Sequence, residues 1–215
     1  MSSVAIIDYG MGNLHSIAKA LQHAKPLERV QITSDAKRIL AADRVVFPGV
    51  GAIRDCMQAI EHFGFTDVLN QAAANKPLLG ICLGMQALLT ESEENGDTGC
   101  LGIIPGKVVH FADNMADSEG AILKVPHMGW NQVYQCGSHP LWDGIPQDSR
   151  FYFVHSYYAK PDNPQHVGAT SEYPVSFACA VKYENIFATQ FHPEKSQAVG
   201  LKLLENFLAW DGSSN

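Results

Sequence analysis

The sequence is poor in charged residues, poorest in positive ones, and it has no long hydrophobic run. Only 17% of its 215 residues are charged, and 15 lysines and arginines stand against 22 aspartates and glutamates. Nucleic-acid binding needs clustered Lys and Arg to neutralise phosphates, so the net charge of −7 argues against such a partner. The apolar stretches are well short of the ~20 residues that a bilayer-spanning helix requires. We therefore expect neither a nucleic-acid-binding protein nor a membrane protein.

Cysteine pairs with metal-ligand spacing are also missing. The five cysteines, at positions 56, 82, 100, 136 and 179, include no CxxC pair. We expect free thiols in a reducing compartment, no metal site and no cofactor. The N-terminus has no basic segment before its first acid, Asp8, so it predicts neither a signal peptide nor a membrane anchor. The expected location is the cytoplasm.

Short apolar runs alternate with helical patterns over the first ninety residues. Each run is too short for a helix and is followed by a stretch with apolar residues three or four apart. The runs span residues 4–7, 30–32, 45–47 and 78–82, and the helical patterns span residues 14–21, 35–40, 53–60, 65–75 and 83–88. Such alternation predicts an α/β fold with an open parallel sheet and helices on both faces.

The glycines after the first apolar run begin a dinucleotide fingerprint without completing it. Gly10 and Gly12 fit the start of G-x-G-x-x-G, but His15 occupies the third glycine position. We therefore expect only a tight turn here, with Asn13 as the N-cap of the helix that follows.

The second half of the chain predicts antiparallel additions rather than further crossovers. Residues 96–144 are rich in Gly, Asp, Asn and Pro and contain short strand patterns typical of surface hairpins. Meandering strands are predicted between residues 151 and 188, and the apolar face of residues 199–208 predicts a final helix docked on the core. No repeat or low-complexity linker interrupts the chain, so we expect a single domain over residues 1–215.

One stretch, residues 76–86, has the pattern of a nucleophile elbow. It places Cys82 between Gly80 and Gly84, where a predicted apolar strand ends and a helical pattern begins. The chain must reverse within about two residues, and the glycines give the room that a strained turn requires. The first amide groups of the following helix then favour thiolate over thiol. A free cysteine more often serves as a small apolar core residue. Glycines on both sides would weaken an ordinary strand, however, so they favour the elbow.

A base for this thiol is available in residues 189–196. Pro193 holds His192 extended, and residues two apart in an extended segment share a face, so Glu194 is expected beside His192. The carboxylate can then fix the tautomer of the imidazole and stabilise its charged form. Ser196 is expected to cap the final helix.

A second glycine-rich turn, Pro48-Gly49-Val50-Gly51, follows another predicted strand. The backbone N–H groups of such a turn are free to donate hydrogen bonds to an oxyanion. A nucleophilic thiol, a base with a carboxylate behind it and an oxyanion site together describe acyl transfer. The remaining histidines have no predicted role, although His127 and His155 are expected to be structural or to line a site. The acidic run at residues 91–94 is expected to be a solvated helix end.

These motifs resemble the class I glutamine amidotransferases, which use a Cys-His-Glu triad on a flavodoxin-like α/β fold. Residues 80–86 and 192–194 carry that resemblance. Residues 8–13, 48–51, 126–131 and 192–196 together look like the branch of the family that supplies ammonia to imidazole glycerol phosphate synthases. The resemblance spans nearly the whole chain. It implies an open, mostly parallel sheet with helices on both faces and added antiparallel hairpins.

For this chain, the resemblance implies hydrolysis of L-glutamine to glutamate and ammonia through a γ-glutamyl thioester on Cys82. The ammonia would pass to a separate cyclase subunit of a heterodimer, which converts PRFAR to imidazole glycerol phosphate and AICAR in histidine biosynthesis. The implied roles are catalytic for Cys82, His192 and Glu194, oxyanion hole for Gly49, Val50, Gly51 and Leu83, glutamine binding for Gln86, Ser156 and Tyr157, and cyclase contact or gating for Asn13, Tyr152 and Lys195.

The motifs leave other interpretations open. A paralogous synthase of surface-polysaccharide assembly, or an amidotransferase that makes anthranilate, GMP or pyridoxal phosphate, would use a similar glutaminase. The same elbow would serve a cysteine peptidase or thiol hydrolase that needs neither glutamine nor a partner. A non-catalytic binding module on this scaffold is disfavoured by the intact Cys82, His192 and Glu194.

Overall fold

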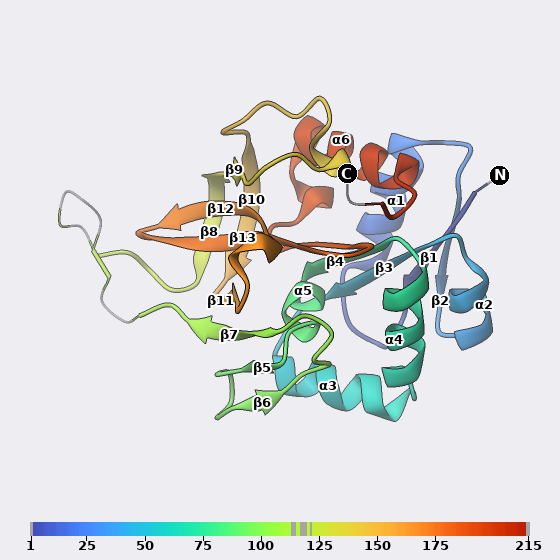
Figure 1. Cartoon of the computed structure of the whole chain (residues 1–215), viewed down its shortest axis with the longest axis horizontal. Helices are drawn as coiled ribbons and strands as arrows, with labels where there is room; N and C mark the ends of the chain where they lie inside the picture. The colour runs from blue at the N-terminus through green and yellow to red at the C-terminus, as the bar shows by residue number, and fades with distance from the viewer. Residues whose placement is uncertain (1, 113–114, 117–119, 121, 214–215) are drawn as a thin grey trace.

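The centre of the computed structural model is a large mixed β-sheet with helices packed on both faces (Figure 1). The structure describes residues 2–112, 115–116, 120 and 122–213. None of the helices in these ranges is both long and apolar enough to cross a membrane.

One half of the sheet is parallel. Its strands lie in the order β2 (Arg29–Thr33), β1 (Ser3–Ile7), β3 (Arg44–Gly49), β4 (Leu78–Cys82) and β14 (Ile186–Thr189), with neighbours parallel. This is the flavodoxin-like order, in which the chain changes direction across the sheet beside β1. Its helices are α1 (Leu14–Ala24), α2 (Ala36–Ala41), α3 (Ile53–His62), α4 (Thr66–Asn75), α5 (Leu83–Ala87) and α6 (Gln197–Ala209).

The other half continues from β14 by antiparallel pairing. It runs through β13 (Val175–Tyr183), β11 (Tyr157–Pro161) and β7 (Gly106–His110). β12 (Val167–Tyr173) pairs with β13 and with the short strand β9 (Tyr134–Gln135), and the short strands β5 (Glu91–Ser92) and β6 (Thr98–Gly99) lie beyond β7. A separate antiparallel ribbon pairs β8 (His127–Gln132) with β10 (Arg150–His155). Single turns of 3-10 helix are η1 (Pro140–Trp142), η2 (Pro164–His166) and η3 (Pro193–Lys195).

Two hydrophobic layers, one on each face of the sheet, make up the core. Along β1, Val4 and Ile6 point into the layer that includes α1 and α6, while Ala5 and Ile7 point into the layer formed with α2 to α5. Successive strand residues face opposite sides, and both faces are covered, so β1 is apolar at nearly every position. In Figure 1, α1 and α6 lie together above the sheet and α3, α4 and α5 lie below it.

The predicted fold class is confirmed, and two local predictions are wrong. The acidic run at residues 91–94 is not a helix end, because Glu91 lies in β5 and the carboxylates of Glu93 and Glu94 accept backbone N–H groups elsewhere. Residues 193–195 are not extended but form η3, although His192 itself has the extended backbone that a following proline favours.

Candidate active site

The carboxyl ends of β3, β4 and β14 meet at one edge of the sheet. In the parallel registers Gly49 lies opposite Cys82, and Thr189 lies opposite Ile81. Because His192 lies three residues beyond the end of β14, this edge gathers the predicted nucleophile, base and oxyanion turn. Ligands of open α/β sheets bind at such carboxyl ends.

Cys82 stands in a strained turn between β4 and α5. Its φ of 55° and ψ of −110° are sparsely populated by residues with a side chain, and such strain is concentrated at functional sites. The two neighbouring glycines have no positive φ, so they serve packing instead of the turn itself. A Cβ at Gly84 would overlap the carbonyl oxygen of Phe47, and one at Gly80 would lie 2.8 Å from the Cβ of Ala188.

A cavity of about 310 Å³ opens beside Cys82. The predicted site residues that line it are Val50, Gly51, Cys82, Leu83, Gln86, Ser156, Tyr157 and His192. The predicted residues outside the lining are Gly49, which precedes the lining residue Val50, Glu194, which lies two residues after His192, and Asn13, Tyr152 and Lys195. The structure therefore brings the candidate nucleophile, base, oxyanion turn and glutamine-binding residues to one cavity.

His192 and Glu194 form a buried ion pair at this cavity. Nδ1 of His192 lies 2.8 Å from Oε1 of Glu194, and the two side chains are only 3% and 1% exposed. Burial opposes charge on the imidazole, but interactions with Cys82 and Glu194 outweigh burial and raise the pKa of His192 to about 10. Nε2 of His192 is buried and has no hydrogen-bond partner among the described residues. This nitrogen is therefore available to exchange a proton with a group in the cavity.

A closed set of hydrogen bonds holds the His192 segment against β10. The N–H of His192 donates to the carbonyl oxygen of Tyr152 over 3.0 Å. The N–H of Tyr152 donates to the Ser196 hydroxyl over 3.0 Å, and that hydroxyl donates to the carbonyl of His192 over 2.6 Å. Ser196 therefore occupies the predicted N-cap position of α6 but makes no side-chain capping bond, because its hydroxyl is used to fix the imidazole segment.

The Pro48–Gly51 turn is positioned by Tyr9. The Tyr9 hydroxyl donates to the carbonyl oxygen of Pro48 over 2.6 Å, and a Cβ at Gly49 would lie 2.7 Å from the same hydroxyl. Gly51 has a φ of 100°, which favours glycine, and Val50 is 40% exposed. The turn is thus held next to Cys82, while its role as an oxyanion hole, shared with Leu83, stays a prediction.

Gln86, on α5, joins two walls of the cavity. Its side-chain Nε2 donates to the carbonyl oxygen of Tyr157 over 3.1 Å and to Oε1 of Gln190 over 3.0 Å. Ser156 and Tyr157 lie where β10 passes into β11. Glutamine binding by Gln86, Ser156 and Tyr157 stays a prediction that their placement supports.

The predicted interface residues lie away from the cavity lining. The ammonium group of Lys195 lies 5.7 Å from the centre of the Tyr152 ring, so these two residues form one surface feature beside η3. Asn13 is exposed and occupies the N-cap position of α1, as predicted, but its side chain makes no capping bond. A role in partner contact stays a prediction for all three.

The sequence interpretation missed several lining residues. Glu94 accepts the backbone N–H of Ile53 over 2.9 Å and so caps the start of α3 from the edge of the cavity. Pro126 and Val154 were also missed, whereas His155, which was expected to be structural or to line a site, does line the cavity. The signal that pointed to part of this wall was the polar-aromatic segment 126–131, which contains Pro126 and His127.

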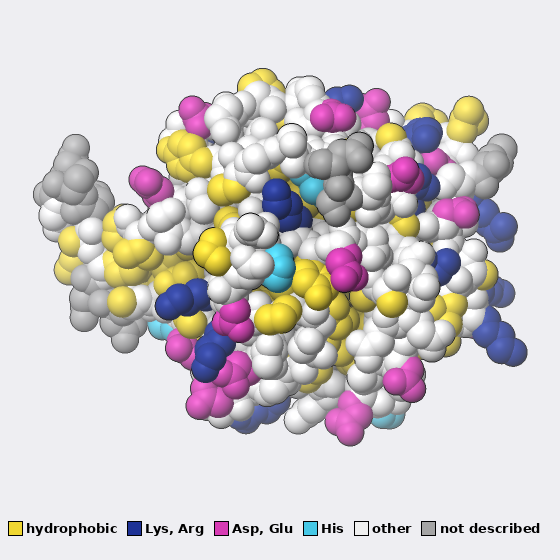
Figure 2. All heavy atoms as spheres, in the orientation of Figure 1, with side chains coloured by type: hydrophobic (Ala, Val, Ile, Leu, Met, Phe, Trp, Pro, Cys, Tyr) yellow, Lys and Arg dark blue, Asp and Glu magenta, His cyan; other side chains and the backbone are white. Residues whose placement is uncertain are grey.

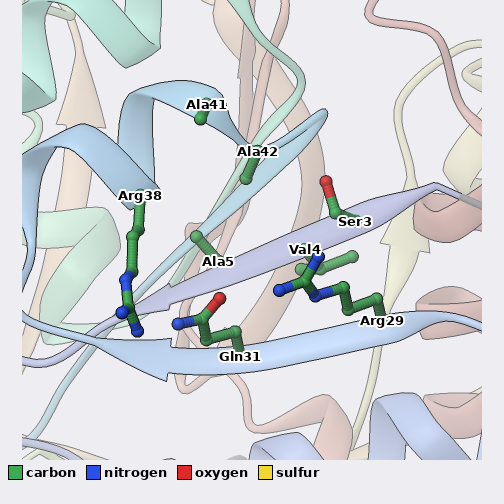
Figure 3. Close-up of a pocket in the computed structure, with 8 residues that line it drawn as sticks. All are labelled: Ser3, Val4, Ala5, Arg29, Gln31, Arg38, Ala41 and Ala42. Carbon is green, nitrogen blue, oxygen red and sulfur yellow. The ribbon is translucent and has the colours of Figure 1, made fainter.

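A second cavity, of about 300 Å³, lies at the opposite edge of the parallel half (Figure 3). Arg29 and Arg38 line it but are exposed, and the ends of Arg38 and Gln31 point toward one another. Several lysines and arginines occupy this end of the molecule in Figure 2, with acidic side chains between them. The amino-terminal edge of a parallel sheet is not where α/β proteins bind substrates, so we place the site at Cys82.

The residues at the Cys82 cavity support nucleophilic chemistry on sulfur. A thiol can attack, an imidazole with a carboxylate behind it can move the proton, and backbone amides can receive charge that develops on an oxygen. In the part of the chain that the structure describes, no group of three or more His, Cys, Asp or Glu side chains is placed to hold a metal ion.

Comparison with known proteins gives the family context. The model of the family "Glutamine amidotransferase class-I" matches residues 5–210. Imidazole glycerol phosphate synthase subunit HisH of Methylococcus capsulatus is 63% identical over 212 residues, covering 98% of each chain. The protein of the same name from Nitrosococcus oceani is 58% identical over 214 residues, covering 100% of each chain.

Solved structures support the fold at much lower identity. A glutamine amidotransferase has a TM-score of 0.71 at 16% identity, covering 96% of this chain and 97% of its own. PurLQS from Thermotoga maritima has a TM-score of 0.69 at 15% identity, covering 97% of this chain and 98% of its own. At such identities the likeness concerns the arrangement of helices and strands alone.

Proposed function

This chain belongs to the class I glutamine amidotransferases, and from that membership we propose that Cys82, His192 and Glu194 hydrolyse glutamine. The chain is an enzyme with glutaminase activity, the glutaminase subunit of imidazole glycerol phosphate synthase in histidine biosynthesis. The observation that carries the chemistry is the shared cavity of Cys82 and His192, with the Glu194 carboxylate 2.8 Å behind the imidazole.

The reaction proceeds through an acyl-enzyme. The sulfur of Cys82, its proton passed to Nε2 of His192, attacks the side-chain amide carbon of glutamine, and amides of residues 49–51 and Leu83 stabilise the oxyanion. His192 returns the proton to the departing nitrogen, and ammonia leaves a γ-glutamyl thioester. Water, deprotonated by His192, then hydrolyses the thioester to glutamate and restores the thiol. Glu194 stabilises the imidazolium at each proton transfer.

Substrate binding and coupling involve the residues around this centre. Gln86, Ser156 and Tyr157 orient glutamine in the cavity. The ammonia passes to a cyclase subunit, which uses it to convert PRFAR to imidazole glycerol phosphate and AICAR. Asn13, Tyr152 and Lys195 contact that partner, and the Val50 peptide reorients to complete the oxyanion hole when the partner holds its substrate.

A glutamine-analogue diazo-ketone tests the proposal directly. We expect covalent modification at Cys82, located by peptide mass spectrometry, and slower modification of the isolated chain than of its complex with the cyclase and PRFAR. Absence of label at Cys82 even in the complex contradicts the proposed glutaminase. Purification of the complex with its native partner identifies the synthase, and a paralogous partner would replace the cyclase in this proposal.

A further inference from the structure

A fully buried glutamine lies against the proposed nucleophile. Gln190, directly after β14, has no exposed surface, and its Nε2 lies 3.7 Å from Sγ of Cys82. Its Oε1 accepts from Gln86 over 3.0 Å. Gln190 is not part of the cavity lining, so it approaches the sulfur from the protein interior rather than from the substrate side.

The orientation of this amide follows from one backbone carbonyl. The carbonyl oxygen of Tyr157 only accepts hydrogen bonds, so the Gln86 atom 3.1 Å away must be its NH₂ group. The same NH₂ group faces Gln190, which must therefore present its oxygen to Gln86. The remaining end of Gln190, which faces Cys82, is then its NH₂ group. An N–H is thus directed at the sulfur.

The same Tyr157 carbonyl is contacted by His155, the first of two buried histidines that bond to one another. Nδ1 of His155 lies 2.8 Å from the Tyr157 oxygen and must carry the proton, which leaves Nε2 of His155 as an acceptor. Nδ1 of His127, 2.9 Å from that Nε2, must then be the donor, and Nε2 of His127 accepts from Asn131 over 3.2 Å. Both imidazoles are neutral in this arrangement, consistent with burial lowering the pKa of His127 to about 4 and of His155 to about 3.

These bonds form one continuous path from β8 to the sulfur. Asn131 and His127 on β8, His155 on β10, the Tyr157 carbonyl, Gln86 on α5 and Gln190 each hold the next member in place. The side chains of His127, His155, Gln86 and Gln190 are buried, and an amide or imidazole placed there without partners would be costly. The segment 126–131, which the reaction itself leaves unexplained, thereby gains a link to the nucleophile.

We propose that Gln190 is a catalytic residue that donates an N–H to the Cys82 sulfur and stabilises the thiolate, and that His127 and His155 are positioning residues for it. The proposal rests on the glutaminase function proposed above. A hydrogen bond to a charged acceptor is about twice as strong as one between neutral groups, so the donor favours thiolate over thiol. The other ionisable groups that act on Cys82 are His192, with Glu194 behind it, and Tyr9, which lies just after β1.

Alkylation of Cys82 by iodoacetamide measures its thiolate fraction without requiring glutamine turnover. The rate is followed from pH 5 to 10 by mass spectrometry of the peptide that contains Cys82, with folding checked by circular dichroism. Gln190→Met removes the donor at nearly constant volume, and Gln190→Glu replaces it with an acceptor charge. We expect rates at neutral pH to fall about tenfold in Gln190→Met and further in Gln190→Glu, with the pH midpoint of alkylation shifted upward.

Controls separate this role from a structural one. Gln165→Met, an exposed position outside the Cys82 cavity, should leave the alkylation profile unchanged. If Gln190→Met does not fold, Gln190→Asn withdraws the amide by one methylene and should give the same direction of shift. His127→Gln should give a smaller shift.

Two outcomes overturn different claims. An unchanged midpoint in folded Gln190 variants, even with reduced stability, assigns Gln190 a packing role and ends the proposal. If the Gln190 variants show the expected slower alkylation and raised pH midpoint, but the diazo-ketone does not label the wild-type complex, the result would instead count against the glutaminase function. The two measurements therefore fail independently.

Discussion

The two halves of the sheet contribute different kinds of groups to the site. The predicted oxyanion turn, Cys82 and His192 lie at or just beyond the carboxyl ends of β3, β4 and β14, which belong to the parallel half. The antiparallel half and the β8–β10 ribbon supply Ser156, Tyr157 and the buried histidines. Parallel strands that are buried on both faces fix backbone ends at one edge, whereas antiparallel strands present alternating side chains. The comparison teaches that reactive groups are placed by backbone register and their surroundings by side-chain packing.

The largest effect is expected at the end of β4. Cys82→Ala removes the atom that forms the thioester, so glutamine hydrolysis in the complex with the cyclase should fall about 10⁶-fold, to background. Glutamate release in an enzyme-coupled assay measures this. Cys136→Ala, in the antiparallel half, is the matched control and should retain wild-type activity. Residual turnover within a hundredfold of wild type in Cys82→Ala would contradict the assignment of the nucleophile.

A smaller loss is expected when the carboxylate behind the base is neutralised. Glu194→Gln preserves the shape of the side chain but no longer stabilises the imidazolium, so kcat should fall about 10⁴-fold. The pKa of His192 should drop from its raised value, because Glu194 is one of the two partners that raise it. The pH profile of residual activity and NMR titration of His192 measure the two effects. Glu205→Gln, an exposed carboxylate on α6, provides the control and should change neither.

Glycines of the two halves should differ in their tolerance of a methyl group. Gly84→Ala places a Cβ against the backbone of β3, where it cannot be accommodated, and should destabilise the fold by about 3 kcal/mol. Gly99→Ala, on β6, meets nothing within 4 Å and should change stability by less than about 0.5 kcal/mol. Urea unfolding compares them. Equal stability of the two variants would show that packing against β3 is not what position 84 requires.

The buried histidines of the β8–β10 ribbon should make the stability of the protein sensitive to acid. The unfolded chain binds protons near the ordinary histidine pKa of about 6.5, but folded His127 does so only near 4 and His155 near 3. Their contribution to stability is therefore complete above about pH 6.5 and is lost as the pH falls toward those values, at about 1.4 kcal/mol per pH unit for each.

Replacement of one of these histidines measures how much of the acid-induced loss of stability it causes. Between pH 7 and pH 5, the free energy of unfolding measured with urea should fall by about 2 kcal/mol less in His127→Gln than in the wild type. His15→Gln, at an exposed position on α1, should follow the wild-type curve. A wild-type stability that is flat across this pH range would mean that the imidazole pair takes up protons in the folded state.

The parallel half could be predicted from the sequence because its signals are local. The apolar runs, the glycines around Cys82 and the short spacing of His192 and Glu194 each lie within a few residues. The rest depended on pairings between distant segments: the β8–β10 ribbon, the contact of Glu94 with α3, and Gln190 against Cys82. A glutamine between Thr189 and Phe191, in a run that is otherwise apolar, was the available sign of Gln190. Capping preference placed Ser196 correctly at the start of α6, but it could not reveal that the hydroxyl bonds to Tyr152 and His192 instead of the helix.

The place of β14 in the sheet has a consequence for protein synthesis. Among the described strands it is the last to leave the ribosome, yet it separates β4 from β13. Until residues 186–192 emerge, β4 lacks a neighbour on one side, and the elbow thiol has neither imidazole nor amide beside it. A chain that ends before residue 186 therefore carries Cys82 without the imidazole and the amide that the proposed reaction uses.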